Sequence, residues 1–485
     1  MSFSILVLCP DVITERMAGP AIRYWEFAKA LVPFFKVTLA APNVIPEILQ
    51  QATQAVLTQH SPENIAELVS QHDIIIFQGH LFDYYPLLRH SEKILIADLY
   101  DPVPLEVLEQ HKDTENLQLI ADQVCMINTQ IKRADYFLCA NERQRDLWLG
   151  HLLALGRINP LTINQIQQRV MTVPFGIPDS PPQRTGTGLR KKLGDRRFIL
   201  LWGGGIWEWF DPLTLIRAIH RLLPRYSDLS LVFLGTQHPN PTIKAMPMQQ
   251  RAEALAHELG LYGKQVIFQR GWVPYDSLHN HLLDADVGVS AHFSSLETRF
   301  CFRTRLLYYL WAGKPIITTT GDVLADEIAQ MKAGIVVNPG DEDAWIAAIE
   351  KLHNPEHYDT YVEGVKTLAQ KYHWSTVTQA LIACCRNASR SQDMILENGS
   401  RKSVVWDCED QYSVLKKELA DCKQTSIDLG EQLEVCKQEY AAVSQQLEMC
   451  KQEYIAVSQQ LEMMAHSISM RVTAPLRTLR RWLMR

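Results

Sequence analysis

The chain has 485 residues, of which 47% are hydrophobic, and this is enough for two or three domains with complete cores. Its net charge of −6 excludes a bulk basic surface of the kind that binds nucleic acid. No run approaches the roughly 18 apolar residues of a membrane-spanning helix, and the ten cysteines show no close framework spacing in the globular part. We therefore expect a cytoplasmic protein.

The first part of the chain alternates short apolar runs with helical patterns. The first run begins at the amino end without a basic flank, so we interpret it as a buried strand rather than a signal peptide. Strands that alternate with helices predict a parallel, doubly wound sheet, which we assign to a first domain at residues 1–175. The predicted strands lie at residues 3–9, 37–40, 73–77, 94–98, 134–139 and 170–174.

Proline and glycine residues between positions 176 and 188 mark a domain boundary, and a second series of strands follows. These strands are predicted at residues 198–201, 229–234, 265–268, 287–290, 316–318 and 334–337. We expect an α/β fold of two Rossmann-like domains that face each other across a cleft, the second at residues 176–390. The carboxyl ends of both sets of strands would then meet at one substrate site.

The most informative segment spans residues 297–318 and reads ETRFCFRTRLLYYLWAGKPIIT. It begins with Arg299, Arg303 and Arg305, continues as a helical pattern and ends in a strand. Guanidinium groups and a helix amino end beyond the carboxyl end of a strand suit a phosphate group. A diphosphate-bearing ligand is the leading interpretation, and a solvated loop face is the alternative.

This segment resembles the donor-binding region of family-4 glycosyltransferases of the GT-B fold. It is most similar to a subgroup of bacterial polysaccharide glycosyltransferases, which shares the pattern ETRFxFRTRxLxYLWAG and a Gly-Gly-Gly-Ile-Trp run, here residues 203–207. The resemblance covers roughly residues 1–389. It implies a nucleotide-sugar donor, transfer that retains the anomeric configuration, no metal ion and no cofactor. It also implies that a helix at about residues 374–386 crosses back to the first domain.

The resemblance and the residue types together indicate roles for individual residues. Glu297, Arg299 and Arg303 are expected to be catalytic, with the two arginines neutralising the leaving diphosphate. The residues expected to bind the donor are Gly19, Gly204, Gly205, Trp207, Trp272, Arg305 and Tyr308.

The chain also departs from the broader family. No Arg/Lys pair follows the first strand of the second domain, where Gly204, Trp207 and Trp209 stand instead. The second glutamate of the family's E-x7-E pair falls on Tyr308. Trp207 either stacks on a sugar or base or packs in the core.

Polar residues of the first domain are predicted at the same cleft. Arg23 lies one helical turn beyond Gly19, and Asp98 and Asp101 follow the strand at residues 94–98. We predict that Arg23, Asp98 and Asp101 bind the acceptor. No metal site is expected, because the histidines lack paired metal-ligand spacing.

The composition changes after residue 391, where four 14-residue units begin at residues 407, 421, 435 and 449, each with cysteine second. Two heptads per unit place an apolar residue at most a and d positions, which predicts a coiled coil at residues 405–470 and a homo-oligomer. The seam residues are Tyr412, Leu419, Ser426, Leu433, Tyr440, Leu447, Tyr454 and Leu461 at a, and Leu415, Cys422, Leu429, Cys436, Val443, Cys450, Val457 and Met464 at d.

The final residues, 471–485, carry five arginines, no acidic residue and apolar side chains at helical spacing. This pattern is typical either of a segment that binds an anionic membrane surface or of a frayed basic tail.

We therefore predict a nucleotide-sugar-dependent, hexosyltransferase-like enzyme of bacterial surface polysaccharide synthesis. Its acceptor would be a saccharide or a lipid-linked saccharide, reached through peripheral contact with the inner face of the plasma membrane. A non-catalytic glycosyltransferase-like scaffold organised by the coiled coil is the main alternative. A GT-B epimerase or phosphorylase is a third, although the sequence shows nothing that looks like a cofactor lysine site.

Overall fold

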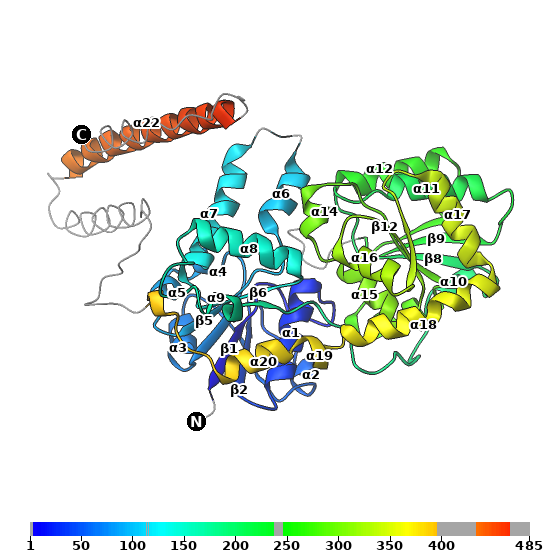
Figure 1. Cartoon of the computed structure of the whole chain (residues 1–485), viewed down its shortest axis with the longest axis horizontal. Helices are drawn as coiled ribbons and strands as arrows, with labels where there is room; N and C mark the ends of the chain where they lie inside the picture. Colours follow the sequence, from blue (N-terminus) through cyan, green and yellow to red (C-terminus); the bar gives the residue numbers. More distant parts are fainter. Residues whose placement is uncertain (1–2, 113, 115, 237–245, 395–432, 466–485) are drawn as a thin grey trace. The chain divides into compact units, whose positions relative to one another are not determined.

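The structure, a computed structural model, describes residues 3–112, 114, 116–236, 246–394 and 433–465 (Figure 1). The chain divides into two compact units, Met1–Lys402 and Ser403–Arg485. The basic tail at residues 471–485 and the first part of the predicted coiled coil, residues 405–432, lie outside the described residues.

Within the described residues, the first sheet has seven strands, all parallel, in the order β3-β2-β1-β4-β5-β6-β7. The strands are β1 (Ser4–Leu8), β2 (Lys36–Ala41), β3 (Val56–Gln59), β4 (Ile74–Phe77), β5 (Ile94–Asp98), β6 (Tyr136–Cys139) and β7 (Val170–Thr172). The sequence pattern predicted all of them except β3. That strand lies at the edge of the sheet and is partly exposed, so it lacks the apolar run that marks the buried strands.

The second sheet of the described chain has six parallel strands in the order β10-β9-β8-β11-β12-β13. Its strands are β8 (Phe198–Gly203), β9 (Leu229–Leu234), β10 (Val266–Gln269), β11 (Val287–Ser290), β12 (Ile316–Thr319) and β13 (Gly334–Val337). The predicted α/β fold with two parallel sheets is confirmed. The strand order reverses at β1 in the first sheet and at β8 in the second, and ligands bind at such reversals in α/β sheets.

Helices connect the parallel strands and cover the sheets, as Figure 1 shows. In the first domain they are α1 (Gly19–Leu31), α2 (Glu47–Gln50), α3 (Ile65–Ser70), α4 (Leu81–Tyr84), α5 (Leu87–His90), α6 (Val103–His111), α7 (Leu117–Arg133), α8 (Glu142–Ala154) and α9 (Ile166–Arg169). In the second they are α10 (Arg190–Leu193), α11 (Pro212–Leu222), α12 (Pro247–Glu258), α13 (Leu278–Asp284), α14 (Leu296–Phe300), α15 (Thr304–Trp311), α16 (Val323–Gln330) and α17 (Glu342–His353).

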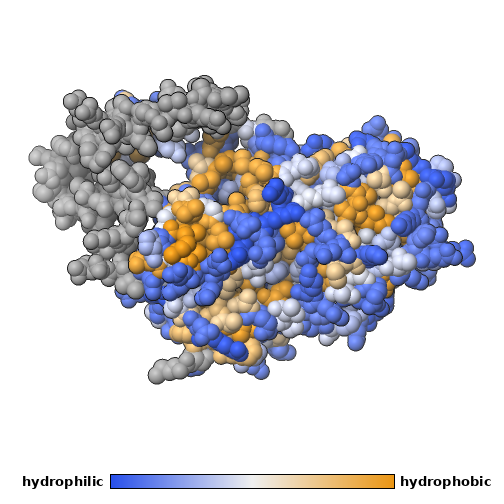
Figure 2. Space-filling view, viewed as in Figure 1, coloured by the Kyte–Doolittle hydropathy of each residue, from blue (hydrophilic) through white to orange (hydrophobic). Residues whose placement is uncertain are grey.

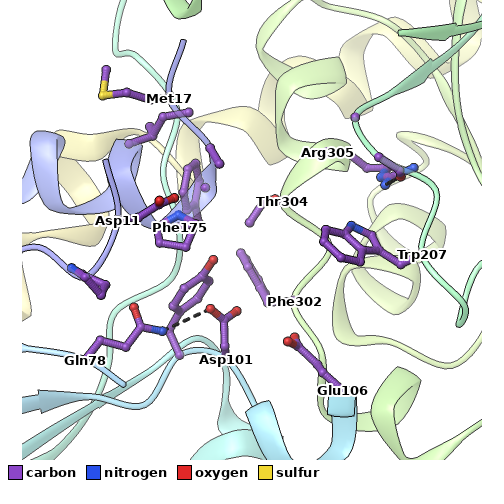
Figure 3. A pocket seen from close by; sticks show the side chains of 18 of the residues that line it. Asp11, Met17, Gln78, Asp101, Glu106, Phe175, Trp207, Phe302, Thr304 and Arg305 are labelled. Carbon is purple, nitrogen blue, oxygen red and sulfur yellow. Dashed lines mark hydrogen bonds between the residues drawn. The ribbon is translucent and has the colours of Figure 1, made fainter. Parts of the chain in front are cut away.

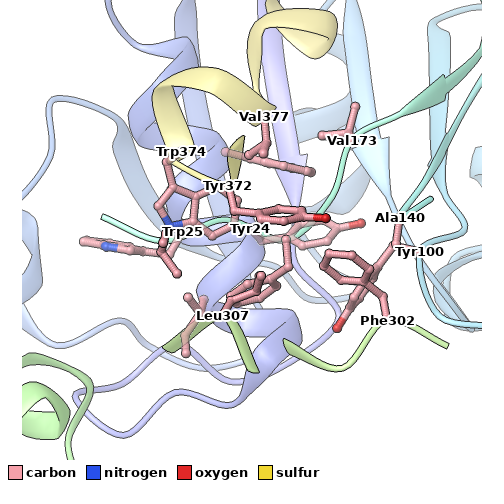
Figure 4. Close-up of a cluster of buried hydrophobic side chains, with 14 of the residues drawn as sticks. Tyr24, Trp25, Tyr100, Ala140, Val173, Phe302, Leu307, Tyr372, Trp374 and Val377 are labelled. Atoms are coloured by element: carbon pink, nitrogen blue, oxygen red, sulfur yellow. The ribbon is translucent and has the colours of Figure 1, made fainter. Parts of the chain in front are cut away.

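After α18 (Pro355–Lys371) the chain returns to the first domain through α19 (Trp374–Val377) and α20 (Gln379–Arg386). Trp374 packs against Phe175 and against the edge of Phe27, with ring centroids 5.1 and 6.4 Å apart (Figure 4). Gly176 has to be glycine, because a Cβ atom there would lie 2.5 Å from the Trp374 ring. The returning segment therefore joins the cores of the two domains.

Direct hydrogen bonds also cross between the domains on two sides. On one side the indole Nε1 of Trp272 donates to the carbonyl of Met17 at 3.0 Å. On the other, Asn141 Nδ2 donates to the carbonyl of Cys301 at 3.2 Å, and Gln144 Nε2 donates to that of Phe300 at 2.8 Å. These bonds hold the facing edges of the two sheets together.

The second unit contains α22 (Leu433–Ala465), a helix of 33 residues that carries the last repeats of the heptad pattern. Seam residues are exposed along it: Tyr440, Val443, Leu447, Cys450, Tyr454 and Val457. An exposed apolar stripe agrees with the predicted coiled coil, and pairing of two such helices stays a prediction. Among the described helices, none combines the length and hydropathy needed to cross a bilayer.

Apolar residues also gather on the surface of the first domain, over α7 in Figure 2. Leu108 of α6 and Leu117 and Val124 of α7 are exposed there. Of these two helices, α6 contributes residues to the cavity described below, and α7 packs against α6.

Candidate functional site

A cavity of about 780 Å³ lies between the two sheets. Residues that follow β1, β4 and β5 line it from the first domain, and residues that follow β8, β9 and β11 line it from the second. Both domains therefore contribute the carboxyl ends of their strands, as predicted. Figure 3 shows side chains from both domains pointing into the same space.

Glycines form the floor of the second-domain half. Gly204 has a φ of +96°, a conformation that side chains disfavour, and its N–H donates to the carbonyl of Leu234 at 2.7 Å. Gly205 follows it, and Gly235, with a φ of +76°, lies against Gly204 and the ring of Trp272. Bare backbone on both loops lets a ligand approach closely, and the donor-binding role of Gly204 and Gly205, which line the cavity, stays a prediction.

Arg305 lines this half of the cavity and has no carboxylate partner among the described residues. Its guanidinium lies 4.0 Å from the ring centroid of Phe210 and 4.9 Å from that of Trp202, and Nη2 donates to the carbonyl of Gly205 at 2.7 Å. Nη1 is buried with no hydrogen-bond partner among the described residues. Burial, with a smaller contribution from the charge of Arg303, lowers the pKa of Arg305 to about 9. An anionic ligand would supply the missing counter-charge.

Arg303 behaves differently, because its charge is already matched. It donates to both carboxylate oxygens of Glu297, at 2.8 and 2.6 Å, and both side chains are buried. The Glu297 carboxylate raises the pKa of Arg303 despite its burial. Arg303 lines the cavity and Glu297 does not. Glu297 and Arg303, both predicted to be catalytic, thus form a buried ion pair that stabilises the fold around the cavity.

The structure does not bring Arg299 to the cavity. Its neighbours Glu297 and Thr298 occupy the buried face of α14, which leaves Arg299 on the exposed face. Its backbone carbonyl accepts a hydrogen bond from Arg143 at 3.5 Å. The expected position of Arg299 at the diphosphate is therefore corrected, because the short helix points it away from the cavity.

The other predicted donor residues all line the cavity. They are Gly19, Trp207, Trp272 and Tyr308. The ring of Trp207 stacks on Trp209 with centroids 5.5 Å apart and planes 10° apart, and Figure 3 shows Trp207 directed into the space. One face of Trp207 therefore packs on Trp209, and its stacking on a sugar or base stays a prediction. The hydroxyl of Tyr308 is buried with no partner among the described residues.

Two of the three predicted acceptor residues are elsewhere. Arg23 and Asp98 form a buried ion pair, with bonds of 2.7 and 2.9 Å. Arg23 also donates to the carbonyls of Val173 and Pro174, so its donors are committed within the domain. Neither residue lines the cavity. The prediction that they bind the acceptor is wrong in geometry, because α1 turns Arg23 onto its buried face.

The third, Asp101, does line the cavity. Burial, together with the charge of Asp98, raises its pKa to about 7, and Gln78 Nε2 donates to its Oδ2 at 3.1 Å. Sequence reasoning missed Glu106 and did not assign Gln78, both of which line the same region. The signal for Glu106 was present in the sequence as an acid five residues beyond Asp101, at the start of a helix.

Comparisons with known proteins bear on the fold and on the second domain. Residues 197–354 match the family described as "Glycosyl transferases group 1". A sequence search of curated proteins finds no match.

Solved structures are similar over most of the chain. Sucrose-phosphate synthase from Thermosynechococcus elongatus has a TM-score of 0.57 at 16% identity, covering 79% of this chain and 98% of its own. HepE from Anabaena, in complex with UDP and glucose, has a TM-score of 0.57 at 14% identity, and the match covers 79% of this chain and 100% of HepE. A UDP-forming α,α-trehalose-phosphate synthase from Burkholderia xenovorans has a TM-score of 0.54 at 13% identity, and the match covers 80% of this chain and 99% of the synthase. At these identities the similarities show a shared two-domain GT-B fold.

Proposed function

We propose that this protein is a glycosyltransferase that moves a sugar from a nucleotide-sugar donor to an acceptor bound in the same cavity. The observation that carries the proposal is Arg305, a buried guanidinium without a carboxylate partner in the described chain, directed at a glycine loop. The family match over residues 197–354 supports it. So does the similar fold of HepE, which was solved with UDP and glucose.

The chemistry follows from where negative charge develops. Cleavage of the bond between the sugar and the nucleotide leaves charge on the diphosphate, and preorganised donors stabilise that charge. Arg305 and the amino end of α15 lie next to the Gly204–Gly205 backbone, so they would receive the diphosphate together. Trp207 would cover the sugar or the base. Retention of the anomeric configuration and independence of metal ions stay predictions from the resemblance.

The acceptor proposal is a saccharide or lipid-linked saccharide of bacterial surface polysaccharide synthesis. Its support is that α6 lines the cavity with Glu106 and Gln110, while Leu108 of the same helix is exposed. An exposed apolar side chain on a helix that also lines the cavity suits a substrate with a lipid portion. The basic tail would add attraction to anionic lipids.

Co-sedimentation with vesicles of phosphatidylglycerol and phosphatidylcholine tests the membrane part. Binding should weaken with added salt and disappear when residues after Ser469 are deleted. Undiminished binding of the truncated protein would remove the tail from the proposal.

Calorimetric titration with UDP, GDP and ADP, followed by hydrolysis of the matching glucose nucleotides, tests the enzyme itself. We expect one nucleoside diphosphate to bind and its sugar nucleotide to be hydrolysed slowly without acceptor. Binding without turnover, in the presence of every sugar acceptor tried, would favour the scaffold alternative. Absence of binding would contradict the donor site.

A further inference from the structure

The two halves of the cavity are lined by different ionisable groups. The second domain supplies Arg303 and Arg305 to the lining. The first domain supplies Asp11, Asp101 and Glu106, and none of its described lining residues is a lysine or arginine. A group that enters the first-domain half therefore meets carboxyl groups and no permanent cation from that domain.

The two histidines of this half do not change the balance. His60 Nε2 lies 3.0 Å from the carbonyl of Cys9, which can only accept, so that nitrogen carries the proton. Nδ1 then accepts from the hydroxyl of Tyr85, 2.7 Å away. Burial lowers the pKa of His60 and keeps the ring neutral. His80 faces Asp83 at 3.0 Å, so its charge is compensated when it is protonated.

The side chain of Gln78 indicates which kind of group the first-domain half binds. Its side chain is only 7% exposed, and its Nε2 is used by Asp101. Its Oε1 is buried with no hydrogen-bond partner among the described residues, although Gln78 lines the cavity. A buried carbonyl oxygen of this kind costs free energy until a donor reaches it. Hydroxyl groups are the donors that a saccharide offers.

Asp101 and Glu106 complete the set from β5 and α6 (Figure 3). Besides Gln78, Asp101 faces the buried Arg23–Asp98 pair and the hydroxyl of Tyr100. Burial and the negative charges of Asp101 and Glu297 raise the pKa of Glu106 well above its ordinary value, while Arg303 opposes them. The protonated form of Glu106, which this shift favours, can donate a hydrogen bond, whereas Gln78 Oε1 and ionised Asp101 accept.

We infer that the first-domain half of the cavity binds the hydroxyl groups of an uncharged saccharide through Gln78, Asp101 and Glu106, and that it rejects a sugar phosphate. The inference rests on the proposed function, since it names the acceptor class of the same site. Hydroxyl donors satisfy Gln78 Oε1 and Asp101, and a hydroxyl oxygen accepts from Glu106. A phosphate group would offer only acceptors to Gln78 Oε1 and Asp101, and its charge would be repelled by Asp101 and Asp11.

Saturation-transfer NMR on the full chain tests this, in the presence of whichever of UDP, GDP and ADP binds. The probes are glucose, galactose and N-acetylglucosamine, each compared with its 6-phosphate at pH 8. At least one neutral sugar should bind, and its 6-phosphate should bind at least about tenfold more weakly. Asp101→Asn and Gln78→Ala should each weaken binding of the neutral sugar by about tenfold or more. The matched control is Asp146→Asn, an exposed acid of α8 that should change nothing.

Glu106 supplies a second, independent readout. Glu106→Gln keeps a donor at that position and should retain binding, while Glu106→Ala should lose it. The inference is overturned if no neutral sugar binds, if a 6-phosphate binds more tightly than its neutral sugar, or if Asp101→Asn leaves binding unchanged. The affinity for that nucleoside diphosphate should be equal in all variants. If the wild-type protein binds none of UDP, GDP and ADP, the proposed function fails instead, and the sugar titrations are still read without nucleotide.

Discussion

Arg303 donates two hydrogen bonds, of 2.8 and 2.6 Å, to the carboxylate of Glu297, and neither side chain reaches bulk solvent. Glu297 belongs to α14, and Arg303 directly precedes α15, so the pair links these two helices. Arg305 lies in the first turn of α15. Two residues of the sequence pattern thus form a buried support, and a third, Arg305, lines the cavity.

This relationship predicts a stability effect rather than a purely catalytic one. Replacing Glu297 by Ala leaves a buried guanidinium without its partner, which costs roughly 3–5 kcal/mol when a buried pair is broken from one side. Urea and thermal unfolding measure the loss. The matched control is Asp343→Asn, whose partner Arg221 lies on the surface, and it should have little effect. If Glu297→Ala is as stable as wild type but has lost turnover, the prediction is wrong and the pair acts in catalysis.

Asp101→Asn should stabilise the protein at neutral pH while it weakens acceptor binding. The pKa of Asp101 is about 7 in the folded protein against 3.8 for the isolated group, so folding favours the protonated form. Ionised Asp101 therefore costs stability above pH 7, and this cost disappears as the pH falls towards 4.

The shift sets an upper limit of about 4 kcal/mol on the gain at pH 8. Unfolding of wild type and variant should coincide at pH 4 and separate as the pH rises. Asp146→Asn should show no separation. A variant that is less stable than wild type at pH 8 would contradict the assigned shift.

The seam of α22 predicts that the full chain is a homo-oligomer. Its exposed apolar a and d residues gain stability only by packing against another helix. Light scattering should give a multiple of the chain mass for the full protein and a monomer for a chain that ends at Ser391. Monomeric mass for both would refute the coiled coil.

Cys450 adds a geometric check on this oligomer. It is exposed and sits at a d position, so in a parallel, in-register pair it meets its own copy. Mild oxidation should cross-link the wild-type chain, and Cys450→Ser should reduce the yield. The exposed Cys125 of α7 provides a control substitution that should leave cross-linking unchanged.

The sequence pattern predicted the fold better than the site, for a physical reason. Buried parallel strands such as Ile74–Phe77 need continuous apolar runs, which are visible in a single sequence, whereas the exposed edge strand Val56–Gln59 does not. Gly204, Trp207 and Arg305 were also found, because the residues around a strand end share one edge of the sheet.

Side-chain direction was the part that could not be predicted. Arg299, Arg303 and Arg305 look alike in sequence, yet one is exposed, one is paired with Glu297 and one is left without an anion. The same holds for Asp98 and Asp101, which lie on one chain segment but face Arg23 and the cavity respectively. Which carboxylate reaches which guanidinium depends on packing between distant elements, and no local pattern records it.

Arg305 is the residue on which the account depends most. Because its buried charge lacks a partner in the described chain, removing that charge should not harm stability, although it should remove the ligand's counter-charge. Arg305→Met should therefore unfold at the wild-type temperature or above. Arg305→Lys should recover part of the function, since an ammonium lacks the planar fork of a guanidinium.

The most direct measurement is calorimetric titration of wild type, Arg305→Met and Arg305→Lys with the nucleoside diphosphate that binds, next to the exposed-site control Arg196→Ala. We predict that Arg305→Met loses about 100-fold in affinity and turnover, that Arg305→Lys lies between it and wild type, and that Arg196→Ala equals wild type. Wild-type nucleotide affinity in Arg305→Met would contradict the account and place the diphosphate elsewhere.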